Sequence, residues 1–315
     1  MTLPSPNRFR GTLVGLAVGD ALGGPVEFMT PEAIITQRGK PVREMIGGGW
    51  LKLRPGETTD DTAMARLLAE SLVACDGFVA DDVAQRYVGW LQTGPKDVGN
   101  ITRVALRAWE QGMTLPNAAF AAHRKQGGKS AGNGTVMRCA PLALRYAFDE
   151  RRLIDSTRDE ALLTHFDPEA ASGSLAVNLL VARFLHGDGI EAALANVVAR
   201  LRYVPQTASS VAAVLENTAA AADSRSLPNS GYVLDTLRIA VWALRGNADF
   251  EETVVAAVNC GGDADTQGAV AGALAGALYG LSAIPTRWLA LLEGRADLEL
   301  LADQLMERAE RTRIV

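Results

Sequence analysis

Residues 259–280 read NCGGDADTQGAVAGALAGALYG, and this stretch decides which kind of fold the chain adopts. Its second half places glycine and alanine at close intervals, a pattern typical of a thin helix that packs tightly in a core. Its first half combines a double glycine with two aspartates and a threonine just before that helix. A rigid central helix is also a good platform for ligand-binding groups at its N-terminus.

Apolar residues recur at helical spacing in many other segments of the chain. These segments cover residues 62–75, 81–90, 101–109, 170–185, 190–201, 209–222, 233–244 and 250–258. Alanine, the best helix former, occurs in nearly all of them, and glycine- or proline-containing turns separate them. Alternation of apolar and polar residues is almost absent, and only residues 42–46 are compatible with a short extended piece. The sequence therefore predicts an all-α fold, with one compact multi-helix domain over residues 1–315.

The bulk composition is that of an ordinary globular protein. Hydrophobic residues make up 48% and charged residues 21% of the 315 positions, a balance that argues against disorder. A net charge of -5 provides no basic field for phosphates, so we expect no nucleic-acid partner. The three cysteines are far apart, as in a reducing compartment, and the first residues lack a signal-peptide core. Residues 269–284 are too few to span a bilayer, so we expect a cytoplasmic protein without membrane insertion.

Two acidic clusters precede predicted helices at distant points of the chain. The first is TTDDT at residues 58–62, and the second is GGDADT at residues 261–266. Helix capping alone could explain one such cluster, because Thr and Asp cap N-termini and acidic groups complement the helix dipole. Two clusters together would offer four carboxylates and two hydroxyls. Such oxygen ligands suit Mg²⁺, Mn²⁺ or Ca²⁺ rather than zinc.

If the two clusters meet in space, their charges would repel unless cations neutralise them. Two divalent cations that share one aspartate would satisfy this many anionic ligands, and such pairs catalyse hydrolysis in many enzymes. Gly261 and Gly262 would let the backbone turn tightly enough to aim Asp263 and Asp265 to one side. The sequence therefore predicts a dinuclear metal site at helix N-termini.

Five motifs, in the expected order, resemble the ADP-ribosylglycohydrolase family. They are GLAVGDALGGPVE at 15–27, MIGGGWLKLRPGETTDDT at 45–62, PKDVGNIT at 95–102, GNGTVMRCAP at 132–141 and the stretch 259–280. The second and third motifs resemble most closely the dinitrogenase reductase-activating branch of that family. Because the motifs run from residue 13 to about residue 288, the resemblance covers nearly the whole chain.

The resemblance implies an all-helical fold, a cofactor of two Mn²⁺ or Mg²⁺ ions, and hydrolysis of the N-glycosidic bond between ADP-ribose and a protein arginine. The metal ligands that it implies are Thr59, Asp60, Asp61, Asp263, Asp265 and Thr266. Asp265 is the best candidate for a ligand that bridges both ions. All six residues are present, which argues against a catalytically inactive relative.

Three acidic residues are the candidate catalytic groups: Glu27, Asp60 and Asp97. By the resemblance, Glu27 lies beside the metals, where it is an outer partner or activates the attacking water; the alternative is a surface glutamate. Asp97 can pair with a guanidinium and donate a proton to the leaving nitrogen. Its alternative is an N-cap of the helix near Ile101. Asp20 is either a polar contact at a helix C-terminus or an outer partner of a metal ligand.

The glycine-rich segment 127–134 is not a Walker loop, but its backbone N–H groups can bind an anion, and the family uses this loop for the ADP-ribose diphosphate. The candidate substrate-binding residues are Asn100, Gly132, Asn133, Gly134, Thr135, His165 and Tyr232. Asp167 stands where relatives often carry a second histidine, so His165 could contact ribose or cap a helix. Tyr232 could stack on adenine or belong to the core. The loop of residues 47–49 could move as a lid.

Other functions remain open from the sequence. The enzyme could act on another linkage, to serine, to a nucleic-acid end or to a small molecule. It could also be a non-catalytic ADP-ribose-binding regulatory protein, although the complete ligand set speaks against this. The resemblance implies an ADP-ribosylated protein substrate, which is nitrogenase iron protein in an organism that fixes nitrogen, and a PII-type regulatory partner. No heptad pattern stands out, so we expect a monomer.

Overall fold

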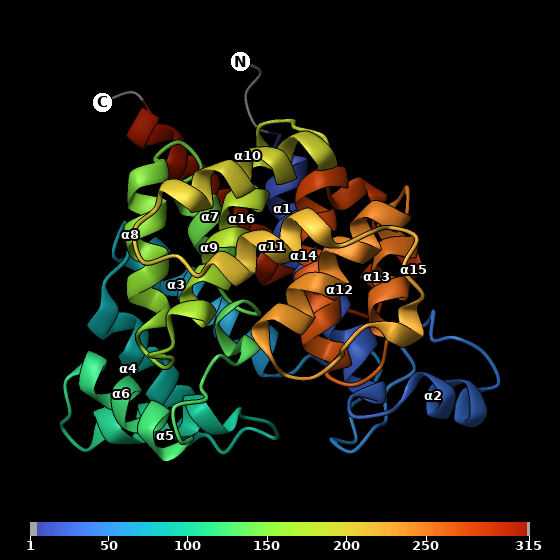
Figure 1. Cartoon of the computed structure of the whole chain (residues 1–315), viewed down its shortest axis with the longest axis horizontal. Helices are drawn as coiled ribbons and strands as arrows, with labels where there is room; N and C mark the ends of the chain where they lie inside the picture. The colour runs from blue at the N-terminus through green and yellow to red at the C-terminus, as the bar shows by residue number, and fades with distance from the viewer. Residues whose placement is uncertain (1–4, 314–315) are drawn as a thin grey trace.

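The computed structural model describes residues 5–313, and this part of the chain is helical with connecting loops (Figure 1). The α-helices are α1 (Pro6–Gly23), α2 (Pro31–Arg38), α3 (Asp60–Ala74), α4 (Ala80–Gln92), α5 (Asn100–Glu110), α6 (Leu115–Lys125), α7 (Ala140–Arg145), α8 (Glu150–Ala161), α9 (Pro168–Leu185), α10 (Ile190–Tyr203), α11 (Ser209–Asn217), α12 (Val233–Gly246), α13 (Phe250–Val258), α14 (Ala264–Tyr279), α15 (Thr286–Leu289) and α16 (Arg295–Arg313). Short 3-10 helices are η1 (Gly24–Val26), η2 (Asn133–Thr135), η3 (Ser224–Ser226) and η4 (Leu281–Ala283). Residues 5–313 form no β-strand, so the predicted all-α fold is confirmed.

Helices α1 and α14 pack against each other in antiparallel orientation, in closer contact than ordinary side chains would allow. Glycines face each other across this contact in three pairs: Gly11 and Gly276, Gly15 and Gly272, and Gly19 and Gly268. Their four-residue spacing places them on one face of each helix. A β-carbon added to Gly19 would lie 1.9 Å from the carbonyl oxygen of Gly268. The two backbones are therefore in direct contact, as expected of a thin, tightly packed helix.

The same two helices are buried on all sides along most of their length. Every residue of α1 from Gly11 to Gly23 is buried, and so is every residue of α14 from Ala264 to Ala277. A helix that is buried all round has no polar face that apolar periodicity could reveal. This explains why α1 does not appear among the segments with clear helical spacing.

The remaining helices surround this central pair. Helices α9, α12 and α13 pack on α14, and α16 packs on α1. Buried apolar side chains from Phe9 to Ala309 form one large cluster. Helices α4, α5 and α6 lie at the lower left of Figure 1, and α2 lies at the lower right. In the described part of the chain, no helix combines the length and hydropathy that crossing a bilayer requires.

Two local predictions need correction. The helix predicted over 209–222 ends at Asn217, where the backbone of Thr218 becomes extended, with φ of -75° and ψ of 106°. Residues 42–46 form no strand; the backbone of Val42 instead pairs with the side-chain amide of Asn259, at 2.8 and 2.9 Å. Within residues 5–313, isolated β-bridges join Gly48 to Leu53 and Gly132 to Tyr232.

Candidate active site

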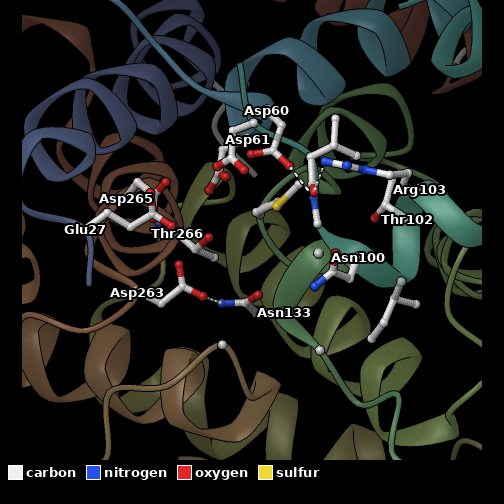
Figure 2. A pocket seen from close by; sticks show the side chains of 18 of the residues that line it. Glu27, Asp60, Asp61, Asn100, Thr102, Arg103, Asn133, Asp263, Asp265 and Thr266 are labelled. Atoms are coloured by element: carbon white, nitrogen blue, oxygen red, sulfur yellow. Dashed lines mark hydrogen bonds between the residues drawn. The ribbon is translucent and has the colours of Figure 1, made fainter. Parts of the chain in front are cut away.

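A cavity of about 620 Å³ opens where the N-termini of α3, α5 and α14 meet the loop at η2 (Figure 2). The predicted site residues that line it are Glu27, Asp60, Asp61, Asp97, Asn100, Gly132, Asn133, Gly134, His165, Asp263, Asp265 and Thr266. They come from segments that are far apart in the sequence. The cavity is therefore the place where both acidic clusters and the glycine loop meet.

The first acidic cluster forms the start of α3. Thr59 is the N-cap residue, and Asp60 and Asp61 belong to the first turn. Among the described residues, the Thr59 side chain caps no backbone N–H; its hydroxyl donates instead to Oδ2 of Asp61, at 3.4 Å. Side-chain capping therefore does not explain this cluster, although Asp60 and Asp61 lie where acidic groups complement the helix dipole. Both carboxylates face the cavity (Figure 2).

Asp20 of α1 takes over the capping of α3 from a distance. Its carboxylate accepts hydrogen bonds from the backbone N–H groups of Thr59 and Thr62 at 3.0 and 3.1 Å, and from the Thr62 hydroxyl at 2.5 Å. Burial raises the pKa of Asp20 to about 6, against the lowering effect of these hydrogen bonds. Asp20 therefore fixes the turn that carries Thr59, one of the predicted metal ligands.

The second acidic cluster forms the start of α14. Asp263 is the N-cap residue and makes no capping hydrogen bond within residues 5–313, and Asp265 lies in the first turn. Gly261 and Gly262 both have φ of 67°, a conformation that favours glycine. A β-carbon on Gly262 would lie 2.0 Å from the carbonyl oxygen of Asn229. The double glycine thus makes the tight turn that the sequence predicts. Asp263 does not cap α14 through its side chain, while Asp265 accepts a hydrogen bond from the backbone N–H of Thr266 at 2.9 Å.

The packing of α1 on α14 brings Glu27 to the second cluster. The C-terminus of α1 lies beside the N-terminus of α14, since a β-carbon on Gly23 would lie 2.2 Å from the Ala264 carbonyl oxygen. The chain then passes through η1 and reaches Glu27. Carboxylate oxygens of Glu27, Asp263 and Asp265 lie within 4.8 Å of one another.

Burial and mutual repulsion disfavour the ionised form of these carboxyl groups. Burial is the largest cause in each case. It raises the pKa of Asp60 to about 8, with Asp97 as the next contributor, and the pKa of Glu27 to about 8. The pKa of Asp61 and that of Asp265 lie well above the usual range, by burial first and then by neighbouring carboxylates. The ionised cluster is therefore unfavourable unless positive charge binds among it.

The residues present fit a divalent cation site. The donors are carboxylates and threonine hydroxyls, which are the hard oxygen ligands of Mg²⁺ and Mn²⁺. Oδ1 of Asp61 is buried and has no hydrogen-bond partner among the described residues. Such an orphaned acceptor at the wall of an acidic cavity is expected where a cation is the missing partner.

The carboxylate of Glu27 is held by Trp50. The indole Nε1 donates to Oε2 of Glu27 at 2.7 Å. Glu27 is only 7% exposed, so the alternative of a surface glutamate is wrong. Next to it, Phe28 has φ of 63° and donates its N–H to the Gly262 carbonyl oxygen at 2.6 Å. This contact ties the segment of Glu27 to the turn that precedes Asp263.

Asp97 lies on the cavity wall beside Asp60. It is half-buried, and burial raises its pKa. Helix α5 begins at Asn100 with Gly99 as its N-cap residue, so the alternative that Asp97 caps this helix is wrong. The N–H of Gly99 donates to Oδ2 of Asp60 at 3.3 Å, which joins the start of α5 to the first acidic cluster. Asn100 is exposed at the same wall.

The glycine loop meets the second acidic cluster through Asn133. Its side-chain amide donates to Oδ2 of Asp263 at 2.8 Å and to the hydroxyl of Thr236 at 2.9 Å (Figure 2). Asn133 therefore orients a predicted metal ligand. Gly132 and Gly134 line the cavity on either side of it. His165, which is 2% exposed, lies against these two glycines.

Two predicted substrate-binding residues do not line this cavity. Thr135 is fully buried, and its hydroxyl donates to the carbonyl oxygen of Ala170 at 3.1 Å, so it holds the loop against α9. Tyr232 forms an isolated bridge with Gly132, and its hydroxyl hydrogen-bonds the carboxylate of Glu169 outside the cavity.

Two cationic side chains of the cavity wall were not anticipated from the sequence, namely Lys96 and Arg103. Arg103 donates to the Val98 carbonyl oxygen at 3.2 Å and lies near enough to Asp97 to oppose the rise of its pKa. Lys96 pairs with Glu57 at 2.6 Å. The sequence did contain a signal for them: Lys96 belongs to the PKDVGNIT motif and Arg103 follows it directly, and an acidic protein needs local cations to bind a pyrophosphate.

Comparison with known proteins agrees with this geometry. Residues 2–314 match the family model described as ADP-ribosylglycohydrolase. The chain is 35% identical over 308 residues to the ADP-ribosyl-[dinitrogen reductase] glycohydrolase of Rhodospirillum rubrum, covering 95% of each chain. It is 32% identical over 314 residues to the ADP-ribosylarginine hydrolase Tri1 of Serratia proteamaculans, covering 97% of this chain and 80% of that relative.

A solved structure described as an ADP-ribosylglycohydrolase-related protein complex superposes with a TM-score of 0.82 at 39% identity, covering 96% of this chain and 98% of that one. With this fold and this site, the protein is a glycosyl hydrolase that acts on ADP-ribosyl groups. The chain belongs to the ADP-ribosylglycohydrolase family. The predicted family and enzyme class are confirmed.

Proposed function

We propose that this chain hydrolyses the N-glycosidic bond between ADP-ribose and an arginine side chain of a protein, with the help of two divalent cations. The meeting of two acidic helix N-termini with Glu27 and Asp97 in one cavity carries the proposal. The arginine linkage is supported by the relatives from Serratia proteamaculans and Pseudomonas putida, which are named ADP-ribosylarginine hydrolases.

Six residues are the proposed oxygen donors for the cations: Thr59, Asp60, Asp61, Asp263, Asp265 and Thr266. Five of them line the cavity, and Thr59 lies behind them, with its hydroxyl hydrogen-bonded to Asp61. Asp265 is the proposed shared ligand, because carboxylates of both clusters, Asp61 and Asp263, contribute to its raised pKa. Mg²⁺ and Mn²⁺ both accept this ligand set. Bound cations supply orientation of the ribose and lower the pKa of the groups that they bind.

Glu27 and Asp97 divide the proton transfers between them. A bond forms between the oxygen of water and the anomeric carbon, while the bond from that carbon to the guanidine nitrogen breaks. Glu27 accepts the proton that the water loses, and Asp97 donates a proton to the leaving nitrogen. The raised pKa of Asp97 favours the protonated carboxyl that this donation needs. The products are ADP-ribose and the unmodified arginine.

The rest of the cavity binds ADP-ribose. Asn100, Gly132, Gly134 and His165 are the proposed contacts to ribose and phosphate oxygens. Asn133 acts through Asp263, which it holds by a hydrogen bond. Thr135 and Tyr232 are left out of this set because they are not on the cavity wall.

Nitrogenase iron protein is one candidate for the modified protein. The Rhodospirillum rubrum relative is named for dinitrogen reductase, which supports nitrogenase iron protein as one target. A PII-type partner, a monomeric state and a cytoplasmic location stay predictions.

Release of ADP-ribose from an arginine-ADP-ribosylated protein, with Mg²⁺, with Mn²⁺ and with chelator, tests the proposal. We expect release that requires a divalent cation. Cleavage of a serine-linked substrate alone would remove Asp97 from its assigned role. Tight ADP-ribose binding without release from any linkage would favour a non-catalytic binding protein and overturn the proposal.

A further inference from the structure

His165 lies on the cavity wall with one ring edge against the glycine loop. A β-carbon on Gly134 would lie 2.9 Å from Cε1 of this ring, and one on Gly132 would lie 3.3 Å from Nε2. No described residue hydrogen-bonds Nε2. Nε2 of His165 is therefore free to contact an oxygen of the ligand. It can donate a hydrogen bond to that oxygen only if Nε2 carries the ring hydrogen.

The other ring nitrogen, Nδ1, is hydrogen-bonded to the side chain of Thr164. Its hydroxyl Oγ1 lies 2.8 Å from Nδ1 of His165, and it accepts a hydrogen bond from Nη2 of Arg138, also at 2.8 Å. Arg138 can only donate. Within residues 5–313, Oγ1 of Thr164 has no other hydrogen-bond partner, and Thr164 is fully buried. The hydroxyl hydrogen of Thr164 therefore finds an acceptor only if it is donated to Nδ1 of His165. Nδ1 must then carry no hydrogen of its own, so the ring hydrogen is on Nε2.

Arg138 is itself fixed by a buried ion pair. Its Nε donates to Oε1 of Glu160 at 2.6 Å, and both side chains are fully buried. The hydroxyl of Tyr87 donates to the same carboxylate oxygen at 3.1 Å, and the guanidinium carbon lies 5.1 Å from the centre of the Tyr87 ring. Buried ion pairs contribute little net stability compared with apolar residues of the same size. The ion pair instead fixes the position of Arg138, which in turn holds the hydroxyl of Thr164 beside His165.

The charge of Arg138 also bears on the protonation of His165. Burial first, and then the nearby guanidinium, lower the pKa of His165 to about 3. The ring is therefore neutral near pH 7, and only one of its two nitrogens carries a hydrogen.

We propose that Thr164 and Arg138 are positioning residues, which hold His165 as the tautomer with its hydrogen on Nε2. This N–H then faces the space next to Gly132 and Gly134 and donates to an oxygen of ADP-ribose. The inference rests on the proposed function for the identity of the ligand, but the tautomer is a property of the protein alone.

The tautomer can be read without any substitution. The chain contains three histidines, so long-range ¹⁵N–¹H correlation spectra of histidine-labelled protein with Mg²⁺ are simple to interpret. The His165→Gln variant identifies the signals of His165. We expect Nε2 to be the protonated nitrogen, and finding the hydrogen on Nδ1 would overturn the proposal.

The dependence on Thr164 is tested with a matched set of variants. Thr164→Val removes the hydroxyl at nearly constant shape, and we expect mixed tautomers and ADP-ribose affinity lowered about tenfold. Thr164→Ser keeps the hydroxyl and should restore both. Thr157→Val removes another fully buried hydroxyl, on α8, and serves as the control that leaves the tautomer and the affinity unchanged.

The outcomes separate this proposal from the proposed function. A Thr164→Val protein with unchanged tautomer and affinity overturns the positioning role, whatever the enzyme cleaves. Equal loss of affinity in Thr164→Val and Thr157→Val would also overturn it, because the effect would then be general destabilisation. Failure to release ADP-ribose from arginine, with the tautomer as expected, would count against the proposed function alone.

Discussion

The contact between α1 and α14 and the acidic cavity at its end place opposite demands on the same two helices. Along the contact, facing glycines let backbones touch, and nothing titratable is needed. At the end of the contact, Glu27, Asp263 and Asp265 bring carboxylate oxygens within 4.8 Å of one another, a cluster that burial makes unfavourable. The first region contributes stability through close packing. In the second region, the fold keeps carboxylates close together although burial and mutual repulsion disfavour their ionised forms.

The difference shows how the fold serves the site. Because the backbones of α1 and α14 touch, the position of α14 determines where α1 ends and hence where Glu27 lies. Asp20, one turn before the end of α1, also holds the first turn of α3. One rigid helix pair therefore aligns both acidic clusters, as expected of a preorganised site on secondary-structure elements.

The largest effect should come from breaking the helix contact. In Gly19→Ala the new methyl would lie 1.9 Å from a backbone oxygen, which cannot move as a side chain would. We expect the free energy of unfolding to fall by about 3 kcal/mol or more. Gly89→Ala, in the exposed interior of α4 with nothing within 4 Å, should raise it by up to about 1 kcal/mol. Urea unfolding measures both, and equal stabilities would contradict close backbone contact.

Neutralising one cavity carboxylate should separate activity from stability. We expect Asp265→Asn to abolish turnover and to weaken Mn²⁺ binding, because a central ligand is lost. Without metal, the same variant should unfold at an equal or higher temperature than the wild type, because one buried like charge is removed. Calorimetric metal titration and thermal unfolding in chelator are the measurements. A destabilised metal-free variant would show that the cluster stabilises the fold.

Asp97 provides a finer test, because it lies on the wall and outside the proposed ligand set. Asp97→Asn should lower turnover of ADP-ribosyl-arginine by about 100-fold or more, the usual contribution of a general acid. Binding of free ADP-ribose should change little. Steady-state kinetics and calorimetry with free ADP-ribose distinguish the two quantities, and parallel losses in both would make Asp97 a binding group.

The metal-free protein should also show a pH-dependent stability. Asp60 and Glu27 have pKa values of about 8 in the folded chain, against usual values of 3.8 and 4.5. Their protonated forms therefore stabilise the fold fully at acidic pH, and this stabilisation is lost as the pH rises toward about 8. In chelator, the unfolding temperature of the wild type minus that of Asp60→Asn should decrease as the pH is raised from about 5 to about 8.5. A constant difference would contradict the raised pKa of Asp60.

Much of the site could be predicted from the sequence because its residues are local to short motifs. Thr59, Asp60 and Asp61 are consecutive, and Asp263 and Asp265 are two positions apart. The start of one helix therefore brings the members of each group together. The capping explanation was reasonable for each cluster taken alone. For α3, Thr59 does not cap through its side chain, because Asp20 from a distant part of the chain accepts from the backbone N–H groups there.

The sequence by itself determined the helical fold, the two acidic clusters and the family resemblance, because helix propensity, turn residues and ligand chemistry are properties of short segments. Only the tertiary structure decided that Asn133 holds Asp263 and that Thr135 is turned into the core. It also decided that Thr164 and Arg138 stand behind His165. Hydrogen-bond partners and burial depend on which helices pack together, and no local pattern encodes that.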